Sequence, residues 1–206
     1  EQAFAHSCNV AFAHIALELG AETLQKYADL SGFNAGLDVD GIKTAAGRVN
    51  VLAAEGADLA WAGIGQYTNT ANPLNFMAFM GAIANNGVRV KPRLLADRGV
   101  FSLLGSSLLE KKRVLSSETA KRLGEMMRNN TLSVYGEKRF QKLELCAKSG
   151  TAEVGGGKKP HSWFAGFLKR EDFPLAFVVV IENGGAGSGV AASVAAKVLQ
   201  AAVSDS

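Results

Sequence analysis

The sequence predicts an α+β protein, an α/β sandwich with a helical N-terminal part, a three-strand antiparallel meander and a C-terminal helix. Two observations predict this class. Apolar residues recur at helical spacing in several segments before residue 130. After residue 142 the period changes to that of strands, and three strand candidates follow one another. Helices and strands that are segregated along the chain in this way are typical of α+β folds.

Two helices, over residues 10–20 and 21–32, are expected near the start of the chain. In each, the apolar residues fall on one face, and each ends at a glycine, Gly20 and Gly32. Glycine is common at helix ends because it adopts left-handed backbone angles without steric cost. Residues 33–71 are mixed and rich in glycine, and they show no single clear period.

The helix with the clearest start and stop signals is expected in NPLNFMAFMGAIANNG, residues 72–87. Its opening asparagine can cap the helix, the proline suits the first helical position, and Asn-Asn-Gly ends it. A further helix is expected from Ser116 or Ser117 through Met127.

Three strands are expected, over residues 143–154, 162–169 and 174–182. The first alternates between apolar and polar residues, which predicts a half-buried strand. A glycine-rich turn, 155–160, joins it to the second strand as a hairpin. The third is a continuous apolar run, as expected of a strand buried on both faces. The Ala/Val-rich segment 190–206 then closes the chain as a helix that could cover the sheet.

Length and composition exclude several classes of protein. The chain has 206 residues, 48% hydrophobic and 20% charged, which fits one soluble globular domain. No run approaches eighteen apolar residues, and the opening EQAFAHSCNV lacks the basic start of a signal peptide. The net charge of +3 comes from scattered lysines and arginines, which predicts no nucleic-acid partner.

Neither metal nor cofactor chemistry is expected. The two cysteines, Cys8 and Cys146, are too few for a disulfide framework and are interpreted as buried small hydrophobes. The three histidines lack the spacing of metal ligands. A G-x-G-x-x-A pattern at 187–192 has the order of a dinucleotide loop, strand, glycines and helix. It lacks the acidic residue expected about 20 positions later and any second βα unit, so we interpret it as a structural loop.

Two triplets stand out. Ser7-Cys8-Asn9 precedes a helix, where serine and asparagine are ordinarily capping residues. Lys148-Ser149-Gly150 lies in the first strand, where a lysine is ordinarily a solvated or edge-blocking charge. Each triplet alone is a weak signal, and their order along the chain carries the information.

S-x-N at a helix start, followed by K-[ST]-G on a strand that enters a hairpin, resembles the penicillin-recognising serine acyltransferases. Nearly the whole chain is similar to the transpeptidase domain of class B penicillin-binding proteins. The segments that carry the resemblance are SCNVAFAHIALELGAETLQKYADLSGFN (7–34), IGQYTNTANPLNFMAFMGAIANNGVRVKPRLL (64–95), CAKSGTAEVGGGKKPHSWFAGF (146–167) and VVVIENGG (178–185).

The resemblance implies an enzyme in which a serine attacks the penultimate D-alanine carbonyl of a peptidoglycan stem peptide. The acyl-enzyme then passes its acyl group to an amine of a neighbouring stem. It implies D-Ala-D-Ala stem peptides and β-lactams as partners, no cofactor, and a location at the extracellular face of the bacterial cytoplasmic membrane. The membrane anchor would lie upstream of this chain.

Residue roles follow from the resemblance. Ser7 would shuttle a proton to the leaving or attacking amine. Asn9 would hydrogen-bond the substrate amide and orient the lysine beside the nucleophile. Lys148 would supply positive charge for the terminal carboxylate of the substrate and would tune Ser7.

The three residues after Lys148 would bind substrate. Ser149 and Thr151 would offer hydroxyls to the carboxylate, and the Thr151 N–H would be half of the oxyanion hole. Gly150 would let the substrate lie against the strand as an added β-strand.

The nucleophile motif of the family, S-x-x-K, is absent, because no serine of the 206 residues has a lysine three positions later. We therefore expect residues 1–206 to be a partial transpeptidase domain without its nucleophile helix and first strands, rather than a natural pseudoenzyme. The chain alone is expected to be inactive. The apolar edge of strand 174–182 is expected to be covered by a second copy or by a complementary fragment.

Two alternatives remain. One is a β-lactamase or β-lactam sensor of the same fold. Class A β-lactamases carry a glutamate in an E-x-x-L-N motif, and the most similar segment of this chain, ANPLN, has Ala71 in its place. The other is a non-catalytic module that binds carboxylates or peptides through Lys148, Ser149 and Thr151.

Overall fold

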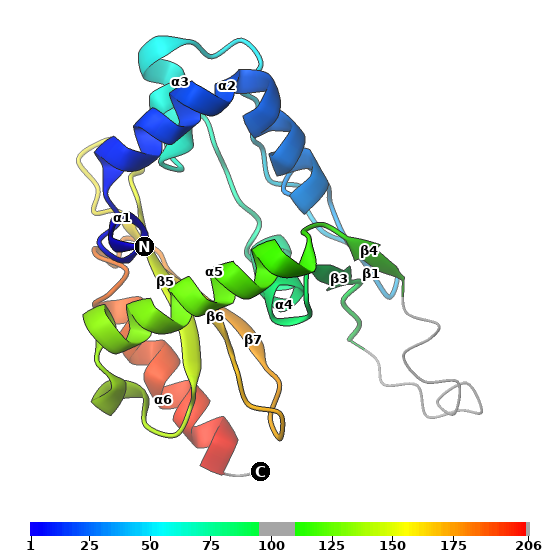
Figure 1. Cartoon of the computed structure of the whole chain (residues 1–206), viewed down its shortest axis with the longest axis vertical. Coiled ribbons are helices and arrows are strands. Elements are labelled where there is room, and N and C mark those ends of the chain that lie inside the picture. The colour runs from blue at the N-terminus through cyan, green and yellow to red at the C-terminus, as the bar shows by residue number, and fades with distance from the viewer. Residues whose placement is uncertain (95–109, 205–206) are drawn as a thin grey trace.

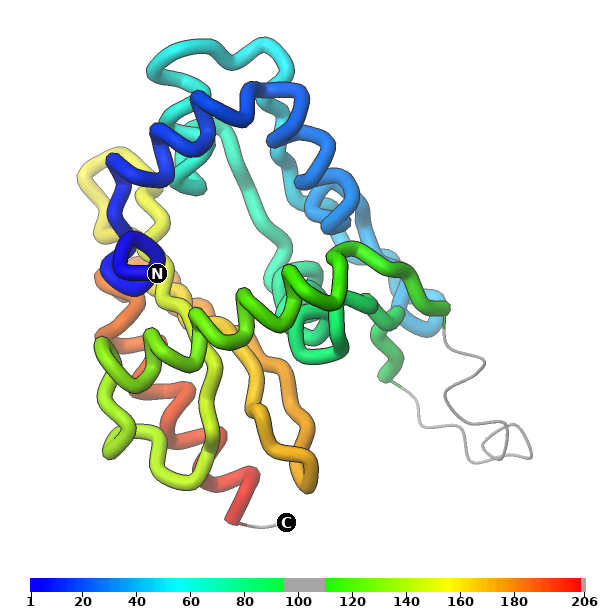
Figure 2. Tube along the Cα trace, viewed as in Figure 1, coloured from blue at the N-terminus to red at the C-terminus, as the bar shows by residue number. Residues whose placement is uncertain are grey.

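The computed structural model describes residues 1–94 and 110–204. Helices α2 (Asn9–Ser31) and α3 (Gly56–Gly63) lie together at one end of the molecule, and the main sheet lies at the other (Figures 1 and 2). The chain passes between the two ends several times, so residues from both ends can reach one site.

The main sheet is a three-strand antiparallel meander in the order β5-β6-β7. It consists of β5 (Leu145–Ala152), β6 (His161–Leu168) and β7 (Ala176–Ile181). Lys148 of β5 lies opposite Ala165 of β6. The predicted α+β class and the three predicted strands are confirmed.

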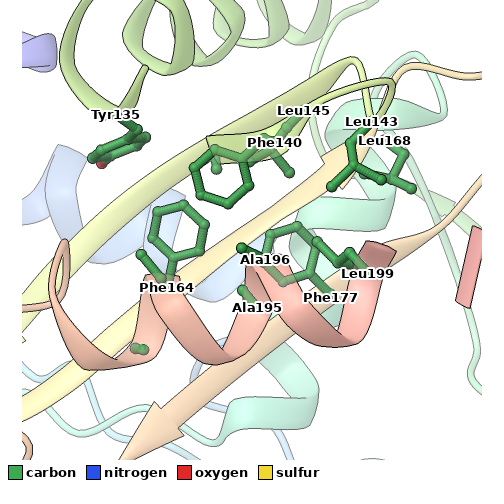
Figure 3. Close-up of a cluster of buried hydrophobic side chains, with 13 residues drawn as sticks. Tyr135, Phe140, Leu143, Leu145, Phe164, Leu168, Phe177, Ala195, Ala196 and Leu199 are labelled. Atoms are coloured by element: carbon green, nitrogen blue, oxygen red, sulfur yellow. The ribbon is translucent and has the colours of Figure 1, made fainter. Parts of the chain in front are cut away.

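Helix α6 (Val190–Ser204) covers one face of this sheet (Figure 1). Figure 3 shows the core between them, in which Phe164 stacks on Phe140 with ring centroids 5.7 Å apart. The alanines on the inner face of α6 let the helix approach the strands closely. The final residues of the predicted C-terminal helix, 205–206, lie outside the described residues.

Helices α4 (Pro73–Ala84) and α5 (Ser117–Asn130) contribute to a second core on the other face of the sheet, around Met80, Met127 and Cys146. With both faces covered, the consecutive residues Leu145, Cys146 and Ala147 are all buried. A hydrophobic core lies against each face of the strand here, so residues on both faces are buried. The predicted half-buried strand is therefore wrong for the first half of β5, where Cys146 is buried as well, whereas residues 148–152 stay partly or fully exposed.

The predicted helix boundaries are confirmed where a breaking glycine or a capping side chain sets them. Gly20, with φ 76° and ψ 161°, interrupts the helical geometry of α2, which confirms a break between two helices. Asn72 caps α4, with its Oδ1 accepting from the Leu74 N–H at 2.8 Å. Ser116 caps α5, with its Oγ accepting from the Thr119 N–H at 3.0 Å.

Several short elements are not predicted from the sequence. They are α1 (Gln2–Ala5), α3, β1 (Asp38–Val39), β2 (Ile42–Lys43), β3 (Val88–Val90), β4 (Lys111–Arg113), the π-helical turn η2 (Thr131–Tyr135) and the 3-10 turn η3 (Glu137–Phe140). Distant contacts position such elements. Arg89 of β3, for example, donates to the Ser31 carbonyl at 3.2 Å and to Asn75 Oδ1 at 2.9 Å.

None of the helices formed by the described residues has the length and apolar character needed to cross a membrane.

Candidate active site

The S-x-N triplet lies at the junction between α1 and α2 and does not serve as a cap. Cys8 occupies the N-cap position of α2, and no side chain makes a capping hydrogen bond there. Ser7 and Asn9 are exposed. Ser7 also has φ 51°, in the left-handed region that residues other than glycine seldom adopt. Six other described residues besides glycine also have positive φ, so this angle alone does not mark the site.

Lys148 meets this triplet from the middle of β5. Its Nζ donates a hydrogen bond to Ser7 Oγ, 141 positions away in the chain, and a second to the Ser149 carbonyl at 3.0 Å. The ammonium also lies 5.8 Å from the centre of the Phe4 ring, within range of a cation–π contact. Burial lowers the pKa of Lys148. Lys148 is therefore not an ordinary solvated surface charge.

Ser149 is held by a tyrosine from outside the sheet. The Ser149 N–H donates to Tyr135 Oη at 2.6 Å, and the Tyr135 hydroxyl donates to Ser149 Oγ at 2.9 Å. Gly150 faces the strand partner Trp163, and a Cβ on Gly150 would come 3.3 Å from the Trp163 Cβ. A side chain at this position would therefore crowd the surface of the strand.

Thr151 is exposed at the end of the triplet. Its carbonyl accepts from Gln66 Nε2 at 3.1 Å, and its Oγ1 accepts from the Gly187 N–H at 3.3 Å. Gln66 follows α3, so the helical end of the molecule contacts β5 at this point.

A cavity of about 510 Å³ adjoins these residues. One wall is polar and is formed by Lys148, Ser149, Gly150 and Thr151. The other walls are mainly apolar and include Phe4, Phe33, Phe76, Phe79, Met80, Ile83, Leu123, Met127 and Trp163. The indole N–H of Trp163 is buried and has no hydrogen-bond acceptor among residues 1–94 and 110–204.

The structure thus brings Ser7 into contact with Lys148 and places Ser149, Gly150 and Thr151 along the same cavity wall. Asn9 begins α2 two residues after Ser7. Phe4, Gln66 and Tyr135 also belong to this neighbourhood, and no motif or period in the sequence marks them.

The two cysteines differ in exposure. Cys146 is buried, and burial raises its pKa to about 11, whereas Cys8 is exposed, so the expectation that both are buried is wrong for Cys8. Over residues 1–94 and 110–204, no three His, Cys, Asp or Glu side chains are grouped so that they could hold a metal ion.

The glycine loop before α6 has a structural role. A Cβ on Gly187 would lie 2.2 Å from the Gly150 carbonyl oxygen, so the glycine is needed where this loop packs on the strands. The buried Ser162 Oγ accepts from the Ala191 N–H at 3.2 Å and donates to the Ala186 carbonyl at 3.0 Å. These contacts explain the G-x-G-x-x-A pattern through packing.

The structure thus places an exposed serine in contact with a partly buried lysine, next to K-S-G on a strand of a sheet that a C-terminal helix covers. The family model for the penicillin binding protein transpeptidase domain matches residues 1–200. The chain belongs to this family.

Similar proteins agree. The chain is 27% identical over 213 residues to the peptidoglycan D,D-transpeptidase PbpA of Mycobacterium tuberculosis, covering 98% of this chain and 43% of PbpA. It is 31% identical over 159 residues to the peptidoglycan D,D-transpeptidase MrdA of Haemophilus influenzae, covering 66% of this chain and 24% of MrdA.

Among solved structures, the chain is similar to penicillin-binding protein A of M. tuberculosis in an imipenem acyl-enzyme complex. The TM-score is 0.83 at 28% identity, with 98% of this chain and 46% of that chain covered. The chain therefore spans less than half the length of each of these three relatives.

Proposed function

We propose that residues 1–206 are part of the transpeptidase domain of a class B peptidoglycan D,D-transpeptidase. The complete protein would cross-link stem peptides through a serine acyl-enzyme and would bind penicillin. The observation that carries this proposal is the hydrogen bond from Lys148 to Ser7 beside an accessible K-S-G strand. The two named relatives, which are D,D-transpeptidases, support it.

Ser7 is suited to a proton relay. Its Oγ accepts from Lys148, so the hydroxyl's own proton can be directed to the leaving amine. Lys148 can replace that proton, and the lowered pKa of this partly buried lysine favours the transfer. Asn9, exposed at the start of α2, is proposed to hydrogen-bond the substrate amide and to orient the lysine of the nucleophile motif.

Substrate binding is assigned to the polar wall of the cavity. Lys148 supplies a positive charge for the terminal carboxylate, and Ser149 and Thr151 supply hydroxyl groups. The Thr151 N–H is proposed as one donor of the oxyanion hole. Gly150 presents backbone without a side chain, which lets a substrate approach as an added strand.

The nucleophile and its lysine are proposed to lie in a part of the complete protein upstream of residue 1. The cavity beside Lys148 is the place for that segment, because its walls are apolar and Trp163 there has an unpaired buried N–H. PbpA, of which this chain spans 43%, is long enough to contain such a segment.

The complete protein is proposed to act at the extracellular face of the bacterial cytoplasmic membrane, held by an anchor outside this chain. Its partners would be D-Ala-D-Ala stem peptides and β-lactams. The solved relative captured as an imipenem acyl-enzyme supports β-lactam recognition.

Intact-protein mass spectrometry with excess benzylpenicillin tests the proposal. The complete protein should gain the mass of one ligand, whereas residues 1–206 alone should gain none, because acylation needs a serine activated by a neighbouring base. An adduct on Ser7 or another serine of residues 1–206 would contradict the assigned roles. The absence of an adduct in the complete protein would instead favour a non-catalytic carboxylate-binding module.

A further inference from the structure

Tyr135 is the last residue of η2 and is 9% exposed. Its ring packs edge-on against Phe164, with centroids 5.1 Å apart, so its position is fixed by the core beneath α6 (Figure 3). Only its hydroxyl reaches the candidate site, where it bonds both the N–H and the Oγ of Ser149. Tyr135 does not line the cavity, so it can affect a ligand there only through Ser149.

The contact belongs to a row of side chains along the outer edge of β5. Arg128 donates to the Leu145 carbonyl at 3.4 Å, and Asn130 Nδ2 donates to the Ala147 carbonyl at 2.9 Å. Tyr135 accepts from the next outward-facing group, the Ser149 N–H. Side chains from α5 and η2 therefore occupy this edge as a neighbouring strand would. Beyond Ser149, the Thr151 carbonyl also has a side-chain partner, Gln66 Nε2 at 3.1 Å.

The hydrogen bonds between Tyr135 and Ser149 determine where the Ser149 hydroxyl can donate its own proton. A tyrosine hydroxyl has one proton and two acceptor lone pairs. The Ser149 N–H occupies one lone pair of Tyr135, and the proton of Tyr135 goes to Ser149 Oγ. Ser149 Oγ therefore acts as an acceptor toward Tyr135, which leaves the proton of the serine hydroxyl to be donated elsewhere.

We propose that Tyr135 is a positioning residue that makes Ser149 a hydrogen-bond donor to the carboxylate of the substrate or β-lactam. This role rests on the proposed function. The nearby Lys148 supplies the charge, and the oriented Ser149 hydroxyl supplies direction, since a hydrogen bond to a carboxylate depends on the angle of its donor. Without the tyrosine hydroxyl, the Ser149 proton can turn away from the ligand, and the Ser149 N–H loses its partner.

The experiment compares acylation of the complete protein by a penicillin that has its free carboxylate and by the methyl ester of the same penicillin. Tyr135→Phe keeps the ring packing and removes the hydroxyl. It should lower the second-order acylation rate for the carboxylate form about tenfold, the size of one lost hydrogen bond to a charged group. The slower rate with the ester should change less than twofold. Tyr27→Phe, at an exposed tyrosine of α2, is the matched control and should change neither rate.

A second variant separates positioning from folding. Site-specific replacement of Tyr135 by 3,5-difluorotyrosine keeps both the ring and the hydroxyl but lowers the phenol pKa toward neutrality. Once ionised, the phenolate cannot donate, so Ser149 must donate to it. The preference for the carboxylate form should then fall as pH rises through that ionisation, relative to the unmodified protein.

Each outcome decides between the two proposals. Equal losses with the carboxylate and ester forms, or a carboxylate preference unchanged in both variants, would show that Tyr135 has only a structural role and would overturn the inference. If the unmodified complete protein forms no adduct with either ligand, the proposed function itself fails, and the role of Tyr135 fails with it.

Discussion

Lys148 carries its charge at an energetic cost in a place where we propose that the charge serves catalysis. Its charged form is disfavoured by burial, which lowers its pKa, and the hydrogen bonds to Ser7 and to the Ser149 carbonyl offset only part of that cost. A partly buried cation whose charged form is disfavoured is expected where the charge is needed for chemistry.

Replacing Lys148 by methionine should separate these two aspects. In the complete protein, Lys148→Met should lower the rate of penicillin acylation about a hundredfold or more, because the variant lacks the proposed proton relay. At pH 7 the variant should be at least as stable as the unmodified protein in thermal unfolding, since the buried charge is gone.

The pH dependence has a definite sign. A lysine whose pKa is lower in the folded than in the unfolded protein binds fewer protons when folded, so the stability of the unmodified protein rises with pH within that window. The advantage of Lys148→Met should therefore shrink as pH rises toward the ordinary lysine pKa of about 10.4. Lys121→Met, at an exposed position of α5, serves as the control and should show no such trend. A variant that is less stable at every pH would contradict this account.

At the residue scale, short motifs predicted the placement of Ser7 and Lys148, because the order of S-x-N and K-S-G is specific. They could not predict Tyr135 or Phe4. These residues reach the site through a π-helical turn and a four-residue helix, whose positions depend on packing against distant parts of the chain.

Among the elements, α2 depends most on a single residue. Gly20 has φ 76° and ψ 161°, a combination that is essentially restricted to glycine. The break lets the two halves of the helix take different directions, as Figure 2 shows. The first half leads from Ser7, and the second ends at Gly32, where Arg89 packs.

Gly20→Ala should therefore destabilise the complete protein by about 1–3 kcal/mol, the cost of a residue in a sparsely populated backbone region. The measurement is denaturant unfolding followed by circular dichroism. Gly124→Ala, within α5, is the matched control. Its Cβ would meet Phe167 at an ordinary 3.4 Å, so it should gain about 0.5–1 kcal/mol from helix propensity. Equal effects at the two glycines would contradict the assigned role of Gly20.

Elements with a cap or a breaking glycine were predictable, as α4 and α5 illustrate. The short strand pairs were not, because two or three residues carry no readable period and β3 pairs with β4 across residues 91–110 of the chain. Burial was predicted less well than strand position. Alternation shows which residues share a face, but it does not show whether a helix covers the opposite face, as at Cys146.

Considered as a whole, the molecule presents an open sheet edge at β7. Within the part of the chain that the structure describes, β7 pairs only with β6, and five of its six residues are partly exposed. An apolar edge of this kind pairs readily with another strand. In the complete protein we propose that another segment covers it.

Residues 1–206 alone should consequently associate as their concentration rises, or should unfold without cooperativity. Sedimentation velocity over a concentration series measures the first outcome, and calorimetry measures the second. Val180→Lys is the control, because Val180 lies on the edge strand outside the two main cores, and a lysine there should reduce association. A clean monomer at high concentration with a cooperative, high-melting transition would refute the proposed coverage of this edge.

Helix α1 is four residues long and contains no buried side chain, yet it leads directly to Ser7. Phe4 anchors this short helix, since its ring packs against the second core and lies under the Lys148 ammonium. Short segments held by few side chains open locally at a lower free energy than the whole protein unfolds. Loss of the Phe4 ring is therefore expected to weaken the Ser7–Lys148 contact more than it weakens the sheet and α6.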